Sequence, residues 1–169
     1  MEGISLEVGF DTVTPNSKHT VTSWAFDRAF STLGNQLIDN RAYDIACYHP
    51  GYTFVEKLQT IATKYRQEQE MGEEKPNLMR QYYDVYCLLE LAAVQEFLNT
   101  DAYRVHKENR FPIKDYEIPI SQNDAFVLPS VEQRQRFKER YLATKALYYN
   151  EQPDFDVLIK RIGQYIDKL

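Results

Sequence analysis

Apolar and polar residues alternate along the start of the chain with the period of a β-strand. Over residues 4–10 this alternation predicts a half-buried strand. Residues 11–18 contain Pro-Asn-Ser and predict a loop, and residues 19–30 begin with β-branched residues and then become ambiguous. A second short strand is predicted over residues 45–48. The residues on the apolar face of the first strand are Ile4, Leu6, Val8 and Phe10.

Further along, apolar positions recur at helical spacing. A long helix is predicted over residues 53–70, opened by a capping box in which Thr53 and Glu56 bind the first free amides. A second helix is predicted over residues 77–93. The charged, glycine-containing stretch at residues 68–76 predicts an exposed loop between the two helices.

The remainder of the chain predicts shorter helices. Two are expected over residues 94–99 and 101–109. Residues 110–129 contain three prolines and are expected to be irregular. A capping box of Ser and Gln predicts the start of a helix over residues 130–149. A final amphipathic helix is predicted after Pro153.

This order of elements predicts an α+β fold with a small, incomplete sheet followed by a mainly helical part. We expect residues 1–50 to hold the sheet and residues 51–169 to form the helical portion, in one compact unit overall. A sheet that opens at residue 4 has few strands of its own, so strands preceding Met1 are expected to complete it. Its open edge would favour pairing with a second copy, giving a homodimer.

Composition narrows the functional class. A hydrophobic content of 43% and a charged content of 27% are typical of globular proteins. The net charge of −5 argues against a general nucleic-acid coat protein. Cys47 and Cys87 form no metal-binding or redox motif and are expected to be small buried hydrophobes in a reducing compartment. No apolar run approaches the roughly 20 residues of a membrane span. We therefore expect a cytoplasmic protein without a membrane partner.

Two charged residues are candidates for a site because their neighbours are apolar or aromatic. Lys57 lies one turn into its predicted helix, where the helix dipole disfavours a cation, so a role in binding an anion such as phosphate is one interpretation. The other is a lysine that extends from a half-buried face to solvent. Asp84 lies among tyrosines, one turn after Arg80. Its alternatives are a carboxylate in a cleft or interface and an ion pair within the helix.

Other polar residues give weaker signals. Glu7 projects from the first strand and would suit a metal ligand or a solvent-facing residue equally. Residues 154–156, Asp-Phe-Asp, follow a proline and open a helix, so we interpret them as capping residues and not as a magnesium site. The basic residues within 134–140 alternate with acids and predict a solvated helix face, with a weak possibility of nucleic-acid binding. The three histidines form no recognisable constellation.

Two motifs carry a resemblance to a known family. Residues 52–58 read Tyr-Thr-Phe-Val-Glu-Lys-Leu, and residues 80–86 read Arg-Gln-Tyr-Tyr-Asp-Val-Tyr. Together with residues 6–10, 23–25 and 146–149, they make the chain similar to the AbiEii-type nucleotidyltransferase toxins. These are the toxin halves of abortive-infection and type IV toxin–antitoxin systems.

The resemblance implies a nucleotidyltransferase core with a helical C-terminal part. Its members transfer a nucleotide from a nucleoside triphosphate to an acceptor, in some cases RNA, with Mg²⁺ bridging the phosphates. An antitoxin protein is the implied partner. By resemblance Lys57 and Asp84 are active-site residues and Glu7 is the acid of a later strand. Arg80 and Lys64 are then expected to bind substrate.

The chain also departs from the family pattern. The family's metal site depends on an upstream Gly-Ser turn and an Asp-x-Asp strand. This sequence contains no Gly-Ser pair, and its one Asp-x-Asp is at residues 154–156. The expectation is therefore a truncated or excised nucleotidyltransferase-like protein that is inactive alone, which leaves enzymatic activity open. The alternatives are a non-catalytic module that binds nucleotide, RNA or protein, and a structural interaction protein.

Overall fold

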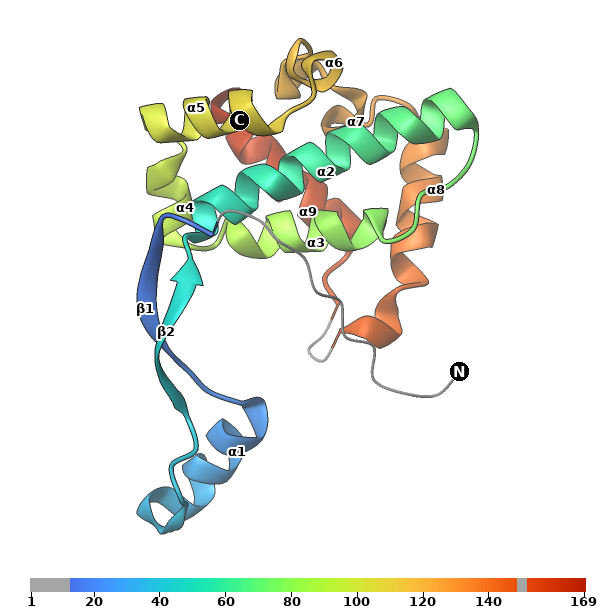
Figure 1. Ribbon diagram of the computed structural model, residues 1–169. Helices are drawn as coiled ribbons and strands as arrows, with labels where there is room; N and C mark the ends of the chain where they lie inside the picture. Colours follow the sequence, from blue (N-terminus) through green and yellow to red (C-terminus); the bar gives the residue numbers. More distant parts are fainter. Residues whose placement is uncertain (1–12, 149–151) are drawn as a thin grey trace. The chain divides into compact units, whose positions relative to one another are not determined.

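The computed structural model describes residues 13–148 and 152–169, and the chain divides into two units, Met1–His49 and Pro50–Leu169. The first unit contains a two-stranded antiparallel sheet and the second is helical (Figure 1). This arrangement confirms the predicted α+β class. The strand expected over residues 4–10, and with it Glu7, lies outside the described residues.

In the first unit, β1 (Asn16–Val21) pairs with β2 (Ala42–Tyr48), and the register runs from Asn16 opposite Tyr48 to Val21 opposite Ala42. The strand predicted over residues 45–48 is confirmed as part of β2. The loop predicted over residues 11–18 is wrong for its last three residues, because hydrogen bonding to β2 outweighs their local turn preference.

The ambiguous segment after β1 forms a helix. Helix α1 (Trp24–Leu33) is opened by Ser23, whose hydroxyl accepts a hydrogen bond from the Phe26 amide at 3.1 Å. A 3₁₀ turn, η1 (Gly34–Gln36), follows, and Gly34 has the positive φ of 54° that glycine adopts without strain. The chain then returns into β2.

The second unit is organised along α2 (Pro50–Met71), a helix of 22 residues against which α3 (Leu78–Leu88) packs. Figure 1 shows these two helices running alongside each other. The other helices are α4 (Ala92–Phe97), α5 (Asp101–Arg110), α6 (Ile113–Tyr116), α7 (Asp124–Val127), α8 (Val131–Leu142) and α9 (Phe155–Tyr165). The 3₁₀ turns of this unit are η2 (Ile120–Gln122), η3 (Lys145–Leu147) and η4 (Ile166–Lys168).

Two helix boundaries differ from the predictions. Helix α2 begins at Pro50, so Thr53 lies inside the helix and the predicted capping box does not form; proline suits the first helical position because its missing N–H needs no partner there. Helix α3 ends at Leu88, whereas a helix to residue 93 was predicted. The Leu89 carbonyl accepts the Gln95 side-chain amide at 2.8 Å, which stabilises the turn before α4.

Other local predictions are confirmed. Ser130 caps α8, and its hydroxyl accepts from the Gln133 amide at 3.3 Å. Asp154 caps α9, and its carboxylate accepts from the Asp156 amide at 2.9 Å. Helix α8 nevertheless ends at Leu142, earlier than predicted. The proline-rich region at residues 110–129 contains the short α6, η2 and α7 as well as irregular backbone.

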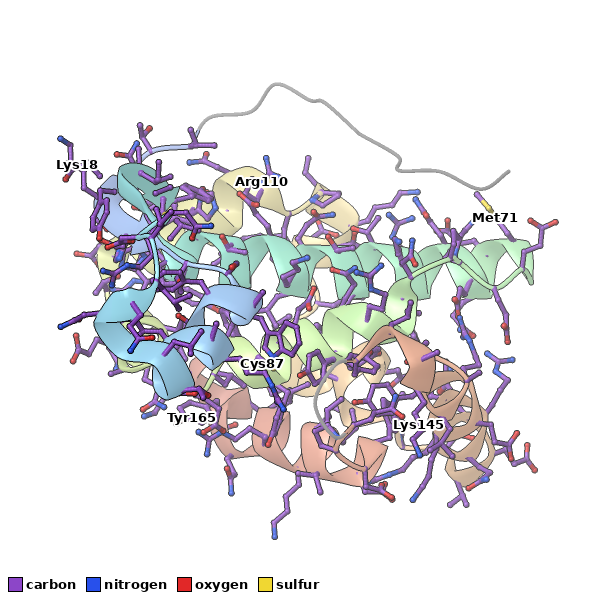
Figure 2. All side chains as sticks on the ribbon, turned by 90° about the horizontal axis from the view of Figure 1, so that it is seen from below. Lys18, Met71, Cys87, Arg110, Lys145 and Tyr165 are labelled. Carbon is purple, nitrogen blue, oxygen red and sulfur yellow. The ribbon has the colours of Figure 1, made fainter. Side chains whose placement is uncertain are left out.

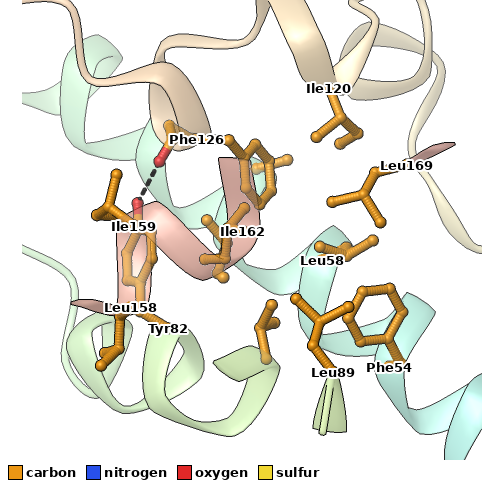
Figure 3. Close-up of a cluster of buried hydrophobic side chains, with 14 of the residues drawn as sticks. Phe54, Leu58, Tyr82, Leu89, Ile120, Phe126, Leu158, Ile159, Ile162 and Leu169 are labelled. Carbon is orange, nitrogen blue, oxygen red and sulfur yellow. Dashed lines mark hydrogen bonds between the residues drawn. The ribbon is translucent and has the colours of Figure 1, made fainter. Parts of the chain in front are cut away.

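The core of the second unit joins α2, α3 and α9. Figure 3 shows Leu58, Tyr82 and Leu158 among its buried side chains, and each of the three is 0% exposed. The Tyr82 hydroxyl donates to the Ala125 carbonyl at 2.6 Å, which satisfies its polar atom inside the core. Helix α3 is thus packed firmly against α2, and the residues on the outer faces of the two helices have a defined spacing.

Two further expectations are corrected. Glu68 was included in both the predicted helix over residues 53–70 and the predicted exposed loop; it belongs to α2, as the helix prediction has it, and is buried because Arg140 neutralises its charge. Cys87, expected to be buried, lies on the exposed side of α3 (labelled in Figure 2). Cys47 is half-buried, and neither cysteine forms a disulfide. Among the described residues no helix combines the length and apolarity that crossing a bilayer would require.

Candidate functional site

The packing of α2 against α3 brings Lys57 and Asp84 together. The Lys57 Nζ lies 2.9 Å from the Asp84 Oδ2, and the two side chains are 31% and 38% exposed. On α2, the neighbours of Lys57 include the fully buried Val55 and Leu58, which fix the direction of the helix face that carries the lysine. The two residues singled out in the sequence therefore form one half-exposed charged site.

This contact bears on one of the interpretations of Asp84 left open by the sequence. An ion pair between Arg80 and Asp84 was one alternative, since the two are a helical turn apart. Within the part of the chain that the structure describes, Asp84 pairs with Lys57, and no ion pair joins it to Arg80. A half-exposed pair of this kind contributes only about 0–1 kcal/mol to stability. Stability alone is a weak reason for placing these two charges here.

Lys64 lies two turns after Lys57 on the same helix. Its ammonium donates to the Pro76 carbonyl at 2.6 Å and so ties α2 to the loop that precedes α3. Burial lowers the pKa of Lys64, and the positive charge of Lys57 lowers it further. The two lysines thus share one electrostatic environment along α2.

Aromatic side chains flank Asp84. The rings of Tyr83 and Tyr148 have centroids 4.4 Å apart. A hydrogen bond with the Cys87 thiol, together with burial, raises the pKa of Tyr83 to about 12. Burial raises the pKa of Tyr148, Asp84 raises it further, and Arg80 acts in the opposite direction, so Tyr148 lies within the field of the site. Tyr148 was not among the candidate site residues predicted from the sequence, although it lies in the family-like stretch at residues 146–149.

The two aspartates of the Asp-x-Asp at the start of α9 are engaged in structural contacts. Asp156 accepts hydrogen bonds from Arg134 at 2.9 Å and from Lys138 at 2.8 Å. Asp154 caps the helix, which confirms the capping interpretation. The basic residues of α8 were expected to form a solvated face, and this is wrong for Arg140, whose side chain is only 14% exposed and binds Glu68.

The donor set near Lys57 is a poor match for a divalent cation. Across residues 13–148 and 152–169, no group of three His, Cys, Asp or Glu side chains is arranged to hold a metal ion. Asp84 brings one carboxylate to the site, and that carboxylate is already paired with Lys57. Mg²⁺ prefers about six oxygen ligands in octahedral geometry. The described residues therefore do not make a magnesium site by themselves.

Comparison with known protein families identifies the following match. The model of a protein family described as nucleotidyl transferase AbiEii toxin, type IV TA system, matches residues 2–161. The matched region includes Lys57, Lys64, Arg80 and Asp84, and both helices that carry them. No curated protein and no solved structure matches the chain.

Proposed function

Because this chain belongs to the AbiEii nucleotidyl transferase toxin family of type IV toxin–antitoxin systems, we propose that Lys57 and Asp84 are the phosphate-handling half of a nucleotidyltransferase site. The observation that carries this proposal is the 2.9 Å contact between Lys57 and Asp84. Two motifs on separate helices contribute one residue each, and packing brings their charged groups into one partly exposed place. The substrate in this proposal is a nucleoside triphosphate.

The geometry suggests a role for each residue. The Lys57 ammonium carries three N–H donors, so one can bind Asp84 while the others bind phosphate oxygens. Asp84 then orients the lysine and remains adjacent to the reacting phosphate. In the transfer itself, an acceptor hydroxyl oxygen bonds to the α-phosphorus, the bond to the leaving pyrophosphate breaks, and the hydroxyl proton passes to a base. We assign Arg80 and Lys64 to substrate binding and Glu7 to the acid of the site.

Metal chemistry is a separate part of the proposal. Mg²⁺, the ion implied by the family, would neutralise triphosphate charge when bound. The described residues do not complete a site for it, and the sequence contains no Gly-Ser pair and no Asp-x-Asp outside residues 154–156. We therefore propose that this chain binds nucleotide but does not transfer it unaided.

A second candidate function uses the same residues without chemistry. The pairing of Asp84 with Lys57 and the lack of a metal-binding cluster among the described residues favour a module that holds nucleotide, RNA or a protein partner. An antitoxin protein is the partner expected from the family. A homodimer through an open sheet edge and a cytoplasmic location are further elements of the proposal.

Nucleotide binding and transfer by the purified chain test both candidates. With Mg²⁺, labelled nucleoside triphosphates and RNA, we expect binding in calorimetry and no labelled RNA product. Lys57→Ala should abolish binding, whereas Lys160→Ala, which removes an exposed lysine of α9, should leave binding unchanged. Binding that survives Lys57→Ala would overturn the site assignment. RNA labelling that depends on Lys57 would instead overturn the proposal that the chain cannot transfer unaided.

A further inference from the structure

A pocket with a volume of about 370 Å³ lies beside Arg80, and we propose that it binds a backbone phosphate of the nucleic-acid strand that accepts the nucleotide. The inference rests on the proposed function of the Lys57–Asp84 site. We call this feature the Arg140 pocket. The residues that carry the argument are Glu74, Lys75, Asn77, Arg80 and Arg140, all of which line it.

The Arg140 pocket is a concentration of positive charge on an acidic protein. Lys75, Arg80 and Arg140 line it, and Glu74 is the one carboxylate among its described lining residues, although the chain as a whole carries a net charge of −5. The first turn of α3 also faces the pocket. Asn77 precedes that turn with a left-handed φ of 61° and makes no side-chain capping bond, so the helix end adds to the positive potential.

Arg140 is held in a fixed orientation. Its Nη1 and Nη2 donate to the two carboxylate oxygens of Glu68 at 2.9 and 2.7 Å, and the Glu68 side chain is only 3% exposed. A bidentate pair fixes both the position and the plane of the guanidinium. The pocket thus contains a preorganised guanidinium, which loses little conformational freedom when an anion binds. Glu68 and Glu74 balance the charge of Arg140, so the net positive charge of the pocket comes from Lys75 and Arg80.

A carboxylate of the protein itself occupies part of the pocket. The Glu74 carboxylate lies 3.2 Å from the Arg140 Nε, and its side chain is 58% exposed. Glu74 is the exposed member of this pair, and solvent weakens its attraction to Arg140, so Glu74 can be displaced at small cost. A backbone phosphate carries the same single negative charge and the same two terminal oxygens as a carboxylate, so it can replace Glu74 at the Arg140 Nε and contact Lys75 and Arg80 in addition. Glu74 therefore marks the position where an incoming phosphate would bind.

The wall of the pocket is tied to the helix that carries Lys57. The backbone amide of Lys75 donates to the Glu68 Oε1 at 2.7 Å, and Lys64 binds the Pro76 carbonyl at 2.6 Å. Both Lys64 and Glu68 belong to α2, so the loop at residues 72–77 keeps its place relative to that helix.

The spacing of residues along α3 suits a nucleic-acid strand that contacts both the Arg140 pocket and the Lys57–Asp84 site. Arg80 lies four residues before Asp84, which corresponds to about 6 Å along a helix. Successive nucleotides in a stacked strand rise by about 3.4 Å. A strand with one phosphate beside Arg80 can therefore place its terminal nucleotide near Asp84, where the proposed transfer occurs. The free triphosphate would bind at Lys57 and not in the Arg140 pocket, so the substrate that Arg80 binds is the acceptor strand.

The test is the salt dependence of binding to a labelled single-stranded RNA, measured by fluorescence anisotropy on the full chain. Each phosphate contact contributes about 0.7 to the slope of log K against log salt for single strands. Lys75→Gln should lower the slope by about 0.7 and weaken binding about fivefold at about 0.1 M salt. Glu74→Gln should strengthen binding. Lys114→Gln, which removes an exposed lysine of α6, is the control and should change neither quantity.

RNA affinity is expected to fall in Lys75→Gln and to rise in Glu74→Gln. A variant that fails to fold would lose affinity in both cases, so the two substitutions together distinguish an effect on binding from a loss of folding. If Lys75→Gln and Glu74→Gln both bind RNA as the wild-type chain does, the pocket assignment is overturned, while the loss of nucleotide binding in Lys57→Ala would still support the proposed function. A second binding experiment uses inorganic tripolyphosphate in place of RNA. The affinity of the chain for tripolyphosphate should be the same in all three Gln variants. A loss of tripolyphosphate binding in Lys75→Gln without a loss of RNA binding would assign the pocket to free nucleotide and overturn the strand assignment.

Discussion

Replacing Glu68 by glutamine removes a charge that three hydrogen bonds hold inside the second unit. Glu68 accepts two bonds from Arg140 and one from the Lys75 amide, and its side chain is 3% exposed. Breaking a buried pair costs about 3–5 kcal/mol because the remaining charge stays buried. Arg140 retains Glu74 at 3.2 Å, so we expect Glu68→Gln to lower the free energy of unfolding by about 3 kcal/mol, the lower end of that range.

Urea denaturation followed by circular dichroism measures this difference. Glu70→Gln is the matched control, because Glu70 pairs with Arg66 on the same helix with a side chain that is 48% exposed. An exposed pair is worth about 1 kcal/mol at most, and the control should stay within that range. The reasoning is refuted if the two variants have the same unfolding free energy. An unchanged denaturant slope would show that the comparison reports stability and not a change in the unfolded state.

The same carboxylate predicts a pH dependence. Burial raises the pKa of Glu68, but the hydrogen bonds from Arg140 and Lys75 outweigh burial and lower it below its usual value of 4.5. A lowered pKa in the folded state means that the stabilising contribution is present above pH 4.5 and is lost as the pH falls through the folded-state pKa. Wild-type stability should therefore decline more steeply with acid than that of Glu68→Gln. Parallel declines of the two proteins would contradict the lowered pKa.

Two smaller perturbations test the core. Tyr82→Phe removes the bond to the Ala125 carbonyl and should cost about 1 kcal/mol in the unfolding free energy measured in urea, plus any cost of leaving that carbonyl unpaired; no loss would argue against the bond. Leu158→Ala should cost about 2–5 kcal/mol, because this side chain is 0% exposed and leaves a cavity between helices. Val157→Ala, on the exposed side of the same helix, should cost far less, and a thermal melt showing equal losses would contradict the packing described here.

Local patterns predicted the helices better than they predicted the site. The apolar stripe of α9, with Phe155, Leu158 and Ile162 buried, follows directly from helical spacing. The cap at Ser130 is equally local, since its partner lies three residues away. Such features depend on neighbours in the sequence, and the sequence contains the information needed to predict them.

Long-range pairing could not be predicted in this way. Glu68 and Arg140 are 72 positions apart, and a pattern read one helix at a time cannot indicate that they meet. The same limit applies to Asp84. Helical spacing predicted an ion pair with Arg80, whereas in the folded chain Asp84 pairs with Lys57 on another helix. Family resemblance had already grouped Lys57 with Asp84 as active-site residues. Their direct contact comes from the packing of α2 against α3.

The Lys57–Asp84 contact also makes the site selective if Lys57 binds phosphate as proposed. Asp84 is a tethered competitor for the lysine, present at a constant high local concentration, 2.9 Å from the ammonium. A singly charged anion that replaced it would exchange one carboxylate-like contact for another, with no gain. A triphosphate brings several charged oxygens and can bind the lysine without displacing the aspartate. The aspartate would then keep singly charged anions from binding Lys57, whereas polyphosphates would still bind.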